Sequence, residues 1–269
     1  MAGLCTSGPL AHQLTGYGTH GLGTCSQLNG EVLFLDSVAY HITTSASRNS
    51  SQKSTQDTSD QEALNDSARE LDPIIRRAAR DAMLPFVQVT LFRPEFRLPL
   101  PLPSKSLSKS SLLQTLSSPP SPGGPLPADL AGATGGQNSF LPFLIRGSFS
   151  SLTIRIGGPM RDDSETLAQV TARAPQWRIK RAKGTIFGFL SPGWSNGISV
   201  SGFHGHFIED EGEGVRRGGH VLDFEVAEGE QGKVEWGVSG HHHLGLPRGA
   251  EWENLELGVD AEGIAKAEG

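Results

Sequence analysis

The chain of 269 residues contains only two cysteines, Cys5 and Cys25, and no long hydrophobic run. Two cysteines are too few for a disulfide framework or a cysteine-rich zinc site, so we expect small buried or free thiols. No stretch reaches the roughly 18 apolar residues of a membrane span. Basic residues are also fewer than acidic ones. The chain has 23 Lys and Arg and 29 Asp and Glu, which gives a formal net charge of −6. This balance argues against nucleic acid as the main partner, because phosphate binding needs a basic patch.

The first residues, Met1-Ala2-Gly3-Leu4-Cys5, lack the charged start and apolar stretch of a signal peptide. We therefore expect a soluble, cytoplasmic protein. Hydrophobic residues make up 36% of the chain, and 34 Gly and 17 Pro accompany them. This composition favours strands and turns over a helical bundle.

Two segments of low complexity interrupt the chain. Residues 43–68 are rich in Ser, Thr, Gln and Asp, and residues 99–137 are rich in Pro, Ser and Gly. Neither holds enough apolar side chains to offset the entropy of ordering, so we predict a disordered loop and an inserted linker. Between them, apolar residues at helical spacing predict a short helix over 69–83, and the alternating run 85–92 predicts a strand.

The remaining pattern is mostly that of strands. The sequence predicts two paired strands at residues 143–149 and 152–156. It also predicts an antiparallel pair of strands at residues 221–226 and 234–238. Between these pairs, the sequence predicts a helix from Ser164 to Ala172, with Ser164 as its N-cap.

The most informative stretch is Gly202-Phe203-His204-Gly205-His206-Phe207, which is followed by Gly218-Gly219-His220. Side chains two apart on a strand point to the same side, so His204 and His206 can present two imidazoles to one point. His220, just beyond a glycine turn, would complete a metal site of three nitrogens with an open coordination position. That open position distinguishes a catalytic zinc from a structural one with four ligands. The alternative is two strand histidines at a solvated surface.

Four other candidates have two readings each. Glu31 follows the turn dipeptide Asn29-Gly30 at the first residue of a strand, where a carboxylate is either functional or simply solvated. Arg155, between apolar neighbours, either points outward or holds a substrate carboxylate. The run 241–243 is three consecutive histidines, which cannot all face one side of a strand, so we interpret it as a polar loop rather than a second metal site. Glu268, one residue from the end of the sequence, is either functional or part of a frayed terminus.

Several segments together resemble the α-acetolactate decarboxylase family. Residues 21–31 are similar to its motif GxGTFxxLDGE, and residues 85–92 to PFAxVTxF. Residues 184–192 resemble GTxxGFxxP, and residues 202–224 resemble GYHxHF followed by GGHVLDF. The tail from 264 to 269 looks like the family's glutamate-bearing end. These matches keep the family's order and span nearly the whole chain outside the two low-complexity segments.

The resemblance implies an α+β fold in which two mixed or antiparallel β-sheet halves pack together with few helices. The expected units are an N-terminal β-rich domain (1–98), an insertion (99–137) and a C-terminal metal-binding β domain (138–245). A tail (246–269) would fold back over the site and complete it. The expected partner is the small-molecule substrate 2-acetolactate, and the expected assembly is a homodimer.

The resemblance also implies a zinc enzyme that converts 2-acetolactate to (R)-acetoin and CO2. The positions that match the family's Zn2+ ligands are His204, His206 and His220. The positions that match its active-site residues are Glu31, Arg155, Glu268 and Thr24. In this reading the metal stabilises the enediolate, Arg155 holds the carboxylate and Glu31 donates a proton. Glu268 shares the proton relay or holds a substrate hydroxyl, and the roles of the two glutamates are interchangeable.

The chain departs from the family pattern at several points. The family usually has one more strand before the position of Met1, which predicts a truncated start. The first arginine of its motif AIRIDGxF aligns with Leu144, and Arg146 follows two positions later. We favour Arg155 as the substrate-binding arginine because its spacing to His204 fits better.

Two alternative functions stay open on this reading. One is an inactive metal-binding relative that acts as an interaction protein. The other is a cupin-like enzyme with three histidines and an additional glutamate ligand, for which Glu209 and Glu211 have plausible spacing.

Overall fold

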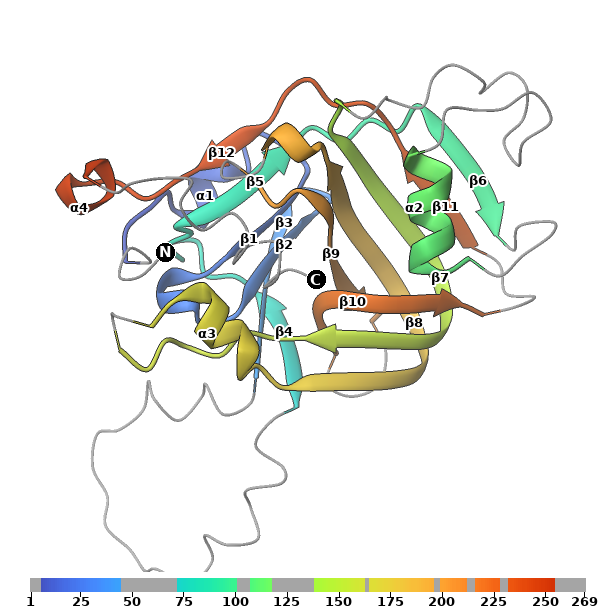
Figure 1. The fold of residues 1–269 in the computed structure, drawn as a ribbon, viewed down its shortest axis with the longest axis horizontal. Helices are drawn as coiled ribbons and strands as arrows, with labels where there is room; N and C mark the ends of the chain where they lie inside the picture. Colours follow the sequence, from blue (N-terminus) through green and yellow to red (C-terminus); the bar gives the residue numbers. More distant parts are fainter. Residues whose placement is uncertain are drawn as a thin grey trace, which may run out of the picture.

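The fold is built on two antiparallel β-sheets of six strands each, which pack face to face (Figure 1). The structure is a computed structural model, and it describes residues 6–44, 72–100, 107–117, 138–162, 165–195, 199–211, 216–227 and 232–254. The expected fold class, two β-sheet halves with few helices, is confirmed.

The first sheet has the strand order β12-β5-β1-β2-β3-β4. Its strands are β1 (His20–Thr24), β2 (Glu31–Leu35), β3 (Val38–Thr44), β4 (Pro73–Arg77), β5 (Phe86–Thr90) and β12 (His243–Gly245). β1 and β2 form the hairpin that the Asn29-Gly30 turn predicts, with Thr24 opposite Glu31. The strand expected over 85–92 is confirmed as β5.

The second sheet has the order β10-β9-β8-β7-β11-β6, and β10 pairs with β7 as well, so that β7 to β10 close on themselves. Its strands are β6 (Phe96–Leu100), β7 (Leu141–Arg155), β8 (Gln176–Ser191), β9 (Gly202–Glu209), β10 (Gly218–Val226) and β11 (Gly232–Trp236). The two long strands β7 and β8 bend, so that one half of β7 pairs with β11 and the other half with β10. This closure brings the start of β10 beside the end of β7, where the candidate site lies.

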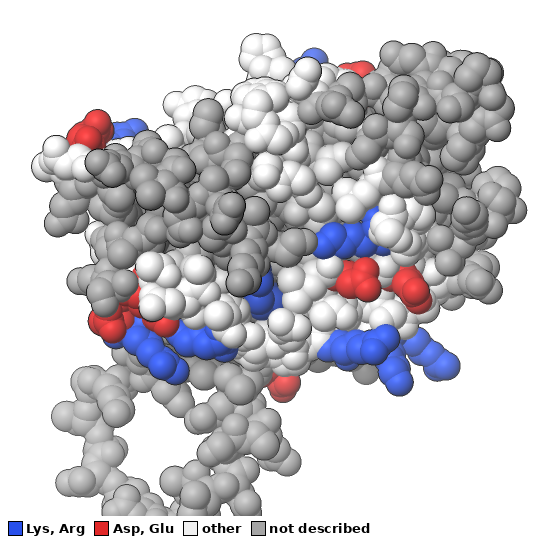
Figure 2. Space-filling view, viewed as in Figure 1, with Lys and Arg blue, Asp and Glu red and all other residues white. Residues whose placement is uncertain are grey.

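The described helices are short and lie outside the sheets (Figure 1). They are α1 (Ala11–Leu14), α2 (Lys109–Ser117), α3 (Leu167–Ala172) and α4 (Ala250–Glu253), and two 3-10 turns span Ser26–Leu28 and Gly193–Ser195. None of the helices in the described ranges has the length and apolarity to cross a membrane. On the face shown in Figure 2, acidic and basic side chains lie side by side.

Two hydrophobic clusters hold the second sheet and join it to the first. The larger cluster is the core of the second sheet. It includes four side chains with no exposed area, Phe143, Phe149, Phe207 and Trp236. The other lies between the sheets and includes Leu22, Leu33, Leu144, Phe187 and Phe189. Burial of apolar area at about 25 cal/mol per Å² makes this inter-sheet contact the main force that positions one sheet over the other.

Several local predictions are wrong. The helix expected over 69–83 is replaced in its described part by strand β4, because the β-branched Ile74 and Ile75 pair with Thr43 and Ile42 in β3. Residues 143–149 and 152–156 form one strand, β7, whose partner is β8. β10 and β11 pair with different halves of β7 and not with each other.

Helix α3 and the expected linker also differ from the predictions. α3 begins at Leu167, and its N-cap is Thr166, which accepts a hydrogen bond from the Gln169 backbone. Ser164 lies outside the described residues. Within 99–137 the structure places the end of β6 and helix α2, whose Leu112 and Leu116 are buried in the core of the second sheet.

The sheets do not follow the domain boundaries expected at residues 98 and 245, because a strand lies at each boundary. β6 belongs to the second sheet, and β12 begins at His243 but belongs to the first. Residues 45–68 of the expected disordered loop, Cys5, and residues 255–269 of the tail lie outside the described part of the chain. Cys25 is a buried free thiol, as expected.

Candidate metal centre

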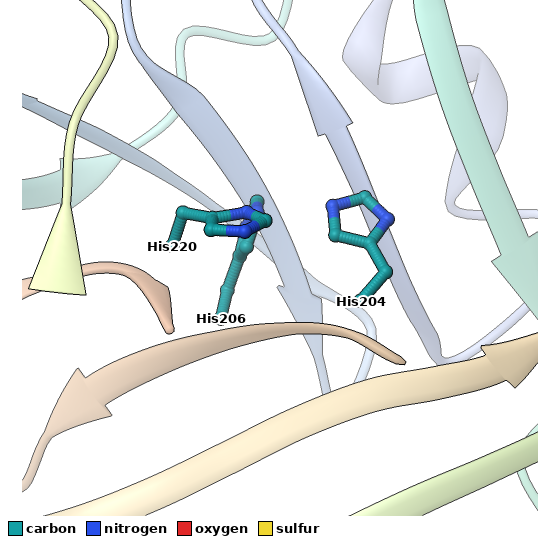
Figure 3. A group of neighbouring side chains, drawn as sticks. All are labelled: His204, His206 and His220. Carbon is teal, nitrogen blue, oxygen red and sulfur yellow. The ribbon is translucent and has the colours of Figure 1, made fainter. Parts of the chain in front are cut away.

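Three histidines of β9 and β10 form one cluster (Figure 3). His204 and His206 lie two residues apart on β9, and His206 pairs directly across the sheet with His220 of β10. One nitrogen from each imidazole lies within 4.8 Å of the other two. Among the described residues, this is the one group of His, Cys, Asp and Glu with such spacing. The strand register therefore produces the cluster that the His-x-His pattern predicted.

Two of the three histidines are buried, His204 is partly exposed, and the donor atoms of the cluster fit a metal. His206 has no exposed area and His220 is 1% exposed. Neither ring nitrogen of His206 makes a hydrogen bond of normal geometry among the described residues, although the Val32 backbone lies near enough to oppose the lowering of the His206 pKa. A buried polar atom without a partner costs about 1–3 kcal/mol, and a metal ion would remove that cost. Three neutral imidazole nitrogens suit zinc and its neighbours among the transition metals.

The protonation state of His206 also suits a metal ligand. Burial lowers its pKa well below the usual value, and the neighbouring His204 lowers the pKa further. The ring is therefore neutral at pH 7. Neutral imidazole is the form that binds a metal. The reading of these histidines as a solvated surface pair does not agree with this burial.

Glu31 reaches the cluster from the first sheet, and Thr24 lies opposite Glu31 in the β1–β2 hairpin. The Oε2 atom of Glu31 lies 3.7 Å from Nε2 of His206. Thr24 stands opposite Glu31 in the hairpin, and its hydroxyl donates a hydrogen bond of 3.1 Å to the carbonyl of Gly30. Thr24 thus holds the turn from which Glu31 begins its strand.

Two features of the turn before Glu31 explain its local shape. Gly30 has a φ of 85°, and a Cβ atom there would lie 2.3 Å from the carbonyl oxygen of Ile42. Only glycine fits such a position without strain. His41 of β3 makes a 2.7 Å hydrogen bond through Nε2 to the carbonyl of Asn29. His41 was not among the residues singled out from the sequence, because only the cross-strand register reveals it.

Arg155 lies at the end of β7, directly opposite His220 in β10. It is 7% exposed, and its buried Nε atom has no hydrogen-bond partner among the described residues. The reading of Arg155 as an outward arginine is therefore wrong. A buried guanidinium beside the histidines is suited to a carboxylate ligand, which it can bind through two parallel hydrogen bonds.

The other arginine on this strand does not join the cluster. Arg146 forms an ion pair of 3.0 Å with Asp36 of the β2–β3 turn. Leu144, which takes the place of the family's first arginine, is 1% exposed and packs between the sheets. Leucine at this position is therefore part of the core between the sheets.

The remaining candidates have other partners. His242 makes a 2.9 Å hydrogen bond with Gln88, and His243 begins β12 and stacks on Tyr17 at 3.8 Å. The prediction of a polar loop is thus wrong for His243. Glu268 lies outside the described residues.

The two glutamates of the cupin-like alternative are engaged elsewhere. Glu209 accepts a 2.8 Å hydrogen bond from Nε of Arg217, and Glu211 pairs with Arg216 at 3.7 Å. Neither glutamate belongs to the group of possible metal ligands that the three histidines form.

Comparison with known proteins supports the resemblance seen in the motifs. Residues 1–60 and 68–259 match the family model described as alpha-acetolactate decarboxylase. The chain belongs to this family. An alpha-acetolactate decarboxylase from Raoultella terrigena is 25% identical over 97% of this chain and 81% of its own length. The enzyme of the same name from Streptococcus thermophilus is 27% identical over 88% of this chain and 79% of its own length.

The solved structures agree on the fold of this family member. The crystal structure of alpha-acetolactate decarboxylase from Bacillus subtilis strain 168 superposes with a TM-score of 0.72, at 22% identity. The superposition covers 99% of this chain and 94% of that one. The expected family and the expected enzyme class are thus confirmed, while the roles of individual residues remain predictions.

Proposed function

We propose that this protein is a zinc-dependent enzyme that decarboxylates 2-acetolactate to (R)-acetoin and CO2. One observation supports this reading most strongly: in a member of this family, Glu31 and Arg155 flank the cluster of three histidines. In the reaction, the bond between C2 and the carboxylate carbon breaks and CO2 leaves. The electron pair of the broken bond passes into the adjacent keto group. The enediolate that results then takes a proton at C2.

The residues that would hold the metal are His204, His206 and His220. Zinc, when bound, supplies a Lewis acid that stabilises the negative charge that CO2 leaves behind. Burial keeps His206 neutral and excludes water around it. Exclusion of water strengthens every electrostatic interaction in the site.

Arg155 binds and orients the substrate carboxylate. Its place opposite His220 brings the guanidinium to one side of the histidine cluster. A bidentate contact there would fix the direction in which CO2 departs. Orientation of a reacting bond in this way lowers the entropic part of the barrier.

Glu31 delivers the proton to one face of C2. One of its oxygens already lies 3.7 Å from His206, so a substrate bound over the histidines lies beside this carboxyl group. Thr24 supports it through the hydrogen bond to the Gly30 carbonyl. Glu268, in the tail, shares the proton relay or holds the substrate hydroxyl.

The stereochemistry of the product tests this assignment. We expect chiral chromatography of acetoin made by the purified protein to give a large excess of the R enantiomer, since one fixed carboxyl group protonates one face. Racemic acetoin would contradict protonation by the protein.

A further inference from the structure

The turn that leads into Glu31 has a strained backbone. Gln27 and Leu28 have φ angles of 57° and 53°, and Gly30 has a φ of 85°. Residues other than glycine rarely adopt such left-handed conformations, because the Cβ atom then crowds the backbone. Strain of this kind persists only where the surroundings hold the backbone in place. The contacts that hold this turn therefore also fix the position from which Glu31 begins its strand.

Backbone hydrogen bonds hold the first half of the turn. The Ser26 amide donates to the carbonyl of Met83 at 3.0 Å, and the Met160 amide donates to the carbonyl of Gln27 at 2.9 Å. Both partners lie outside the β1–β2 hairpin. These two bonds anchor the half of the turn that is farther from Glu31 in the sequence.

Two side chains hold the second half of the turn. The Thr24 hydroxyl donates to the carbonyl of Gly30 at 3.1 Å, and Nε2 of His41 donates to the carbonyl of Asn29 at 2.7 Å. Since the acceptor is a carbonyl, Nε2 of His41 carries the proton. The His41 ring also lies over the glycine, because a Cβ atom at Gly30 would be only 2.9 Å from Nε2. His41 thus contacts both residues that directly precede Glu31.

His41 does not face the candidate metal centre. In the register of β2 and β3, His41 stands opposite Val32, and Ile42 stands opposite Glu31. Successive side chains in a strand point to opposite faces of the sheet. Ile42 belongs to the hydrophobic cluster between the sheets, and Val32 to a separate cluster with helix α1. His41 therefore lies behind the first sheet, and its effect on Glu31 passes through the backbone.

We propose that His41 is a positioning residue for Glu31. Its hydrogen bond to the Asn29 carbonyl holds the strained turn in place, so that Glu31 begins β2 with its carboxyl group 3.7 Å from His206. Without this bond, the turn relaxes toward unstrained backbone angles, and the carboxyl group moves away from the face of the substrate that it protonates. This inference rests on the proposed function for the role of Glu31 as proton donor.

The test compares a variant that keeps the hydrogen-bond donor with one that loses it. In His41→Gln the side-chain amide can place an N–H group near the position of Nε2, whereas His41→Met gives a side chain of similar shape with no donor. His41 is partly exposed, so both substitutions are compatible with folding, and His41→Leu is a second variant without a donor. The matched control is His12→Met. The exposed His12 also has a 2.7 Å hydrogen bond between a ring nitrogen and a carbonyl, that of Arg80, which lies outside this turn.

Loss of the donor should lower the rate and not the metal content. Displacement of a catalytic group by about 1 Å can cost about 10²-fold in rate, so we expect the smaller displacement in His41→Met to lower kcat about tenfold. KM should stay within about twofold of wild type, because substrate binding does not depend on the donor. The excess of R acetoin should also fall, since water then competes with the carboxyl group to protonate the enediolate.

The two controls decide whether the donor itself matters. His41→Gln should return kcat to within about threefold of wild type and restore the R excess, because it restores the hydrogen bond. His12→Met should match the wild type. Unchanged kcat and R excess in His41→Met, with zinc content and melting temperature retained, would overturn the inference. Equal losses in His41→Gln and His41→Met would overturn it too.

Amide hydrogen exchange separates this inference from the proposed function, because it needs no turnover. In the zinc-loaded proteins, residues 26–33 should exchange about tenfold faster in His41→Met than in wild type or His41→Gln, while residues 202–209 keep wild-type exchange. If the wild type forms no acetoin but this selective change occurs, the decarboxylase assignment fails and His41 still positions Glu31. Equal exchange in all variants, or faster exchange over the whole chain, overturns the inference whether or not acetoin forms.

Discussion

The carboxylate of Glu31 lies 3.7 Å from Nε2 of His206, although the two residues belong to different sheets. Glu31 begins β2 of the first sheet, and His206 lies on β9 of the second. The candidate proton donor and the candidate metal ligands therefore meet only when the inter-sheet core forms. Changes in that core should affect turnover more than they affect metal binding, which depends on β9 and β10 alone.

Removal of one imidazole should remove the metal. We expect His206→Ala to lose stoichiometric zinc, because the two remaining nitrogens cannot hold it tightly in competition with water. Metal analysis by mass spectrometry after gel filtration measures the zinc content. His241→Ala is the control, since His241 is exposed and lies outside the cluster. Zinc retained at one equivalent in His206→Ala, with an unchanged circular dichroism spectrum, would show that the ligand assignment is wrong.

Loss of the proton donor should leave the metal in place. Glu31→Gln keeps the shape of the side chain and removes the acid, so we expect unchanged zinc content and a kcat about 10² to 10⁴ lower. Steady-state rates of acetoin formation measure this effect. The exposed Glu225 supplies a matched variant, Glu225→Gln, for which we expect wild-type rates. Wild-type turnover by Glu31→Gln would remove this residue from the mechanism.

Thr24 acts on the turn before Glu31 rather than on the metal. In Thr24→Val the hydrogen bond to the Gly30 carbonyl is lost, at a cost of about 0.5–1.5 kcal/mol, while that carbonyl keeps its 3.2 Å hydrogen bond from the Cys25 amide. We expect kcat to fall about tenfold with zinc retained, and Thr24→Ser to recover most of the rate because it restores the hydroxyl. Equal rates in both variants would argue against a positioning role for the hydroxyl.

His20 should make stability depend on pH. Burial between Phe92 and Phe187 lowers its pKa from 6.5 to about 4, and Asp36 opposes this only in part. The unfolded chain thus binds this proton near pH 6.5 and the folded chain only near pH 4. The contribution of His20 to stability is therefore complete above pH 6.5 and is lost as the pH falls toward 4, by up to about 3 kcal/mol.

The measurement for His20 is urea unfolding of the zinc-free protein at pH 7 and pH 4.5. The His20→Leu variant should lose less stability over this interval than the wild type, because its buried side chain cannot bind a proton. Parallel losses in the two proteins would mean that other groups, such as His41 or His206, account for the acid sensitivity.

Much of the site could be predicted from the sequence because its histidines sit on one strand and on the first part of the next. A spacing of two on β9 fixes the face of His204 and His206, and the glycines before His220 point to a turn or strand start. Arg155 could be chosen only through the family resemblance. His41 was missed because its importance depends on a contact from a neighbouring strand that no local pattern records.

The fold was predictable in class but not in its connections. Alternating apolar residues predict strands, yet they do not tell which strands pair, so the pairing expected for β10 and β11 was wrong. The two isoleucines of β4 mimic a helical spacing and are instead held in a strand by their cross-strand partners. Long-range pairing, which local propensity does not encode, decides both cases.

Chelator-sensitive acetoin formation from racemic 2-acetolactate is the most direct test of a zinc-dependent decarboxylase. The purified protein should produce acetoin, lose that activity after treatment with a chelator and dialysis, and regain it when zinc is added back. Folded, zinc-loaded protein that forms no acetoin, or turnover that survives complete removal of the metal, would contradict this function.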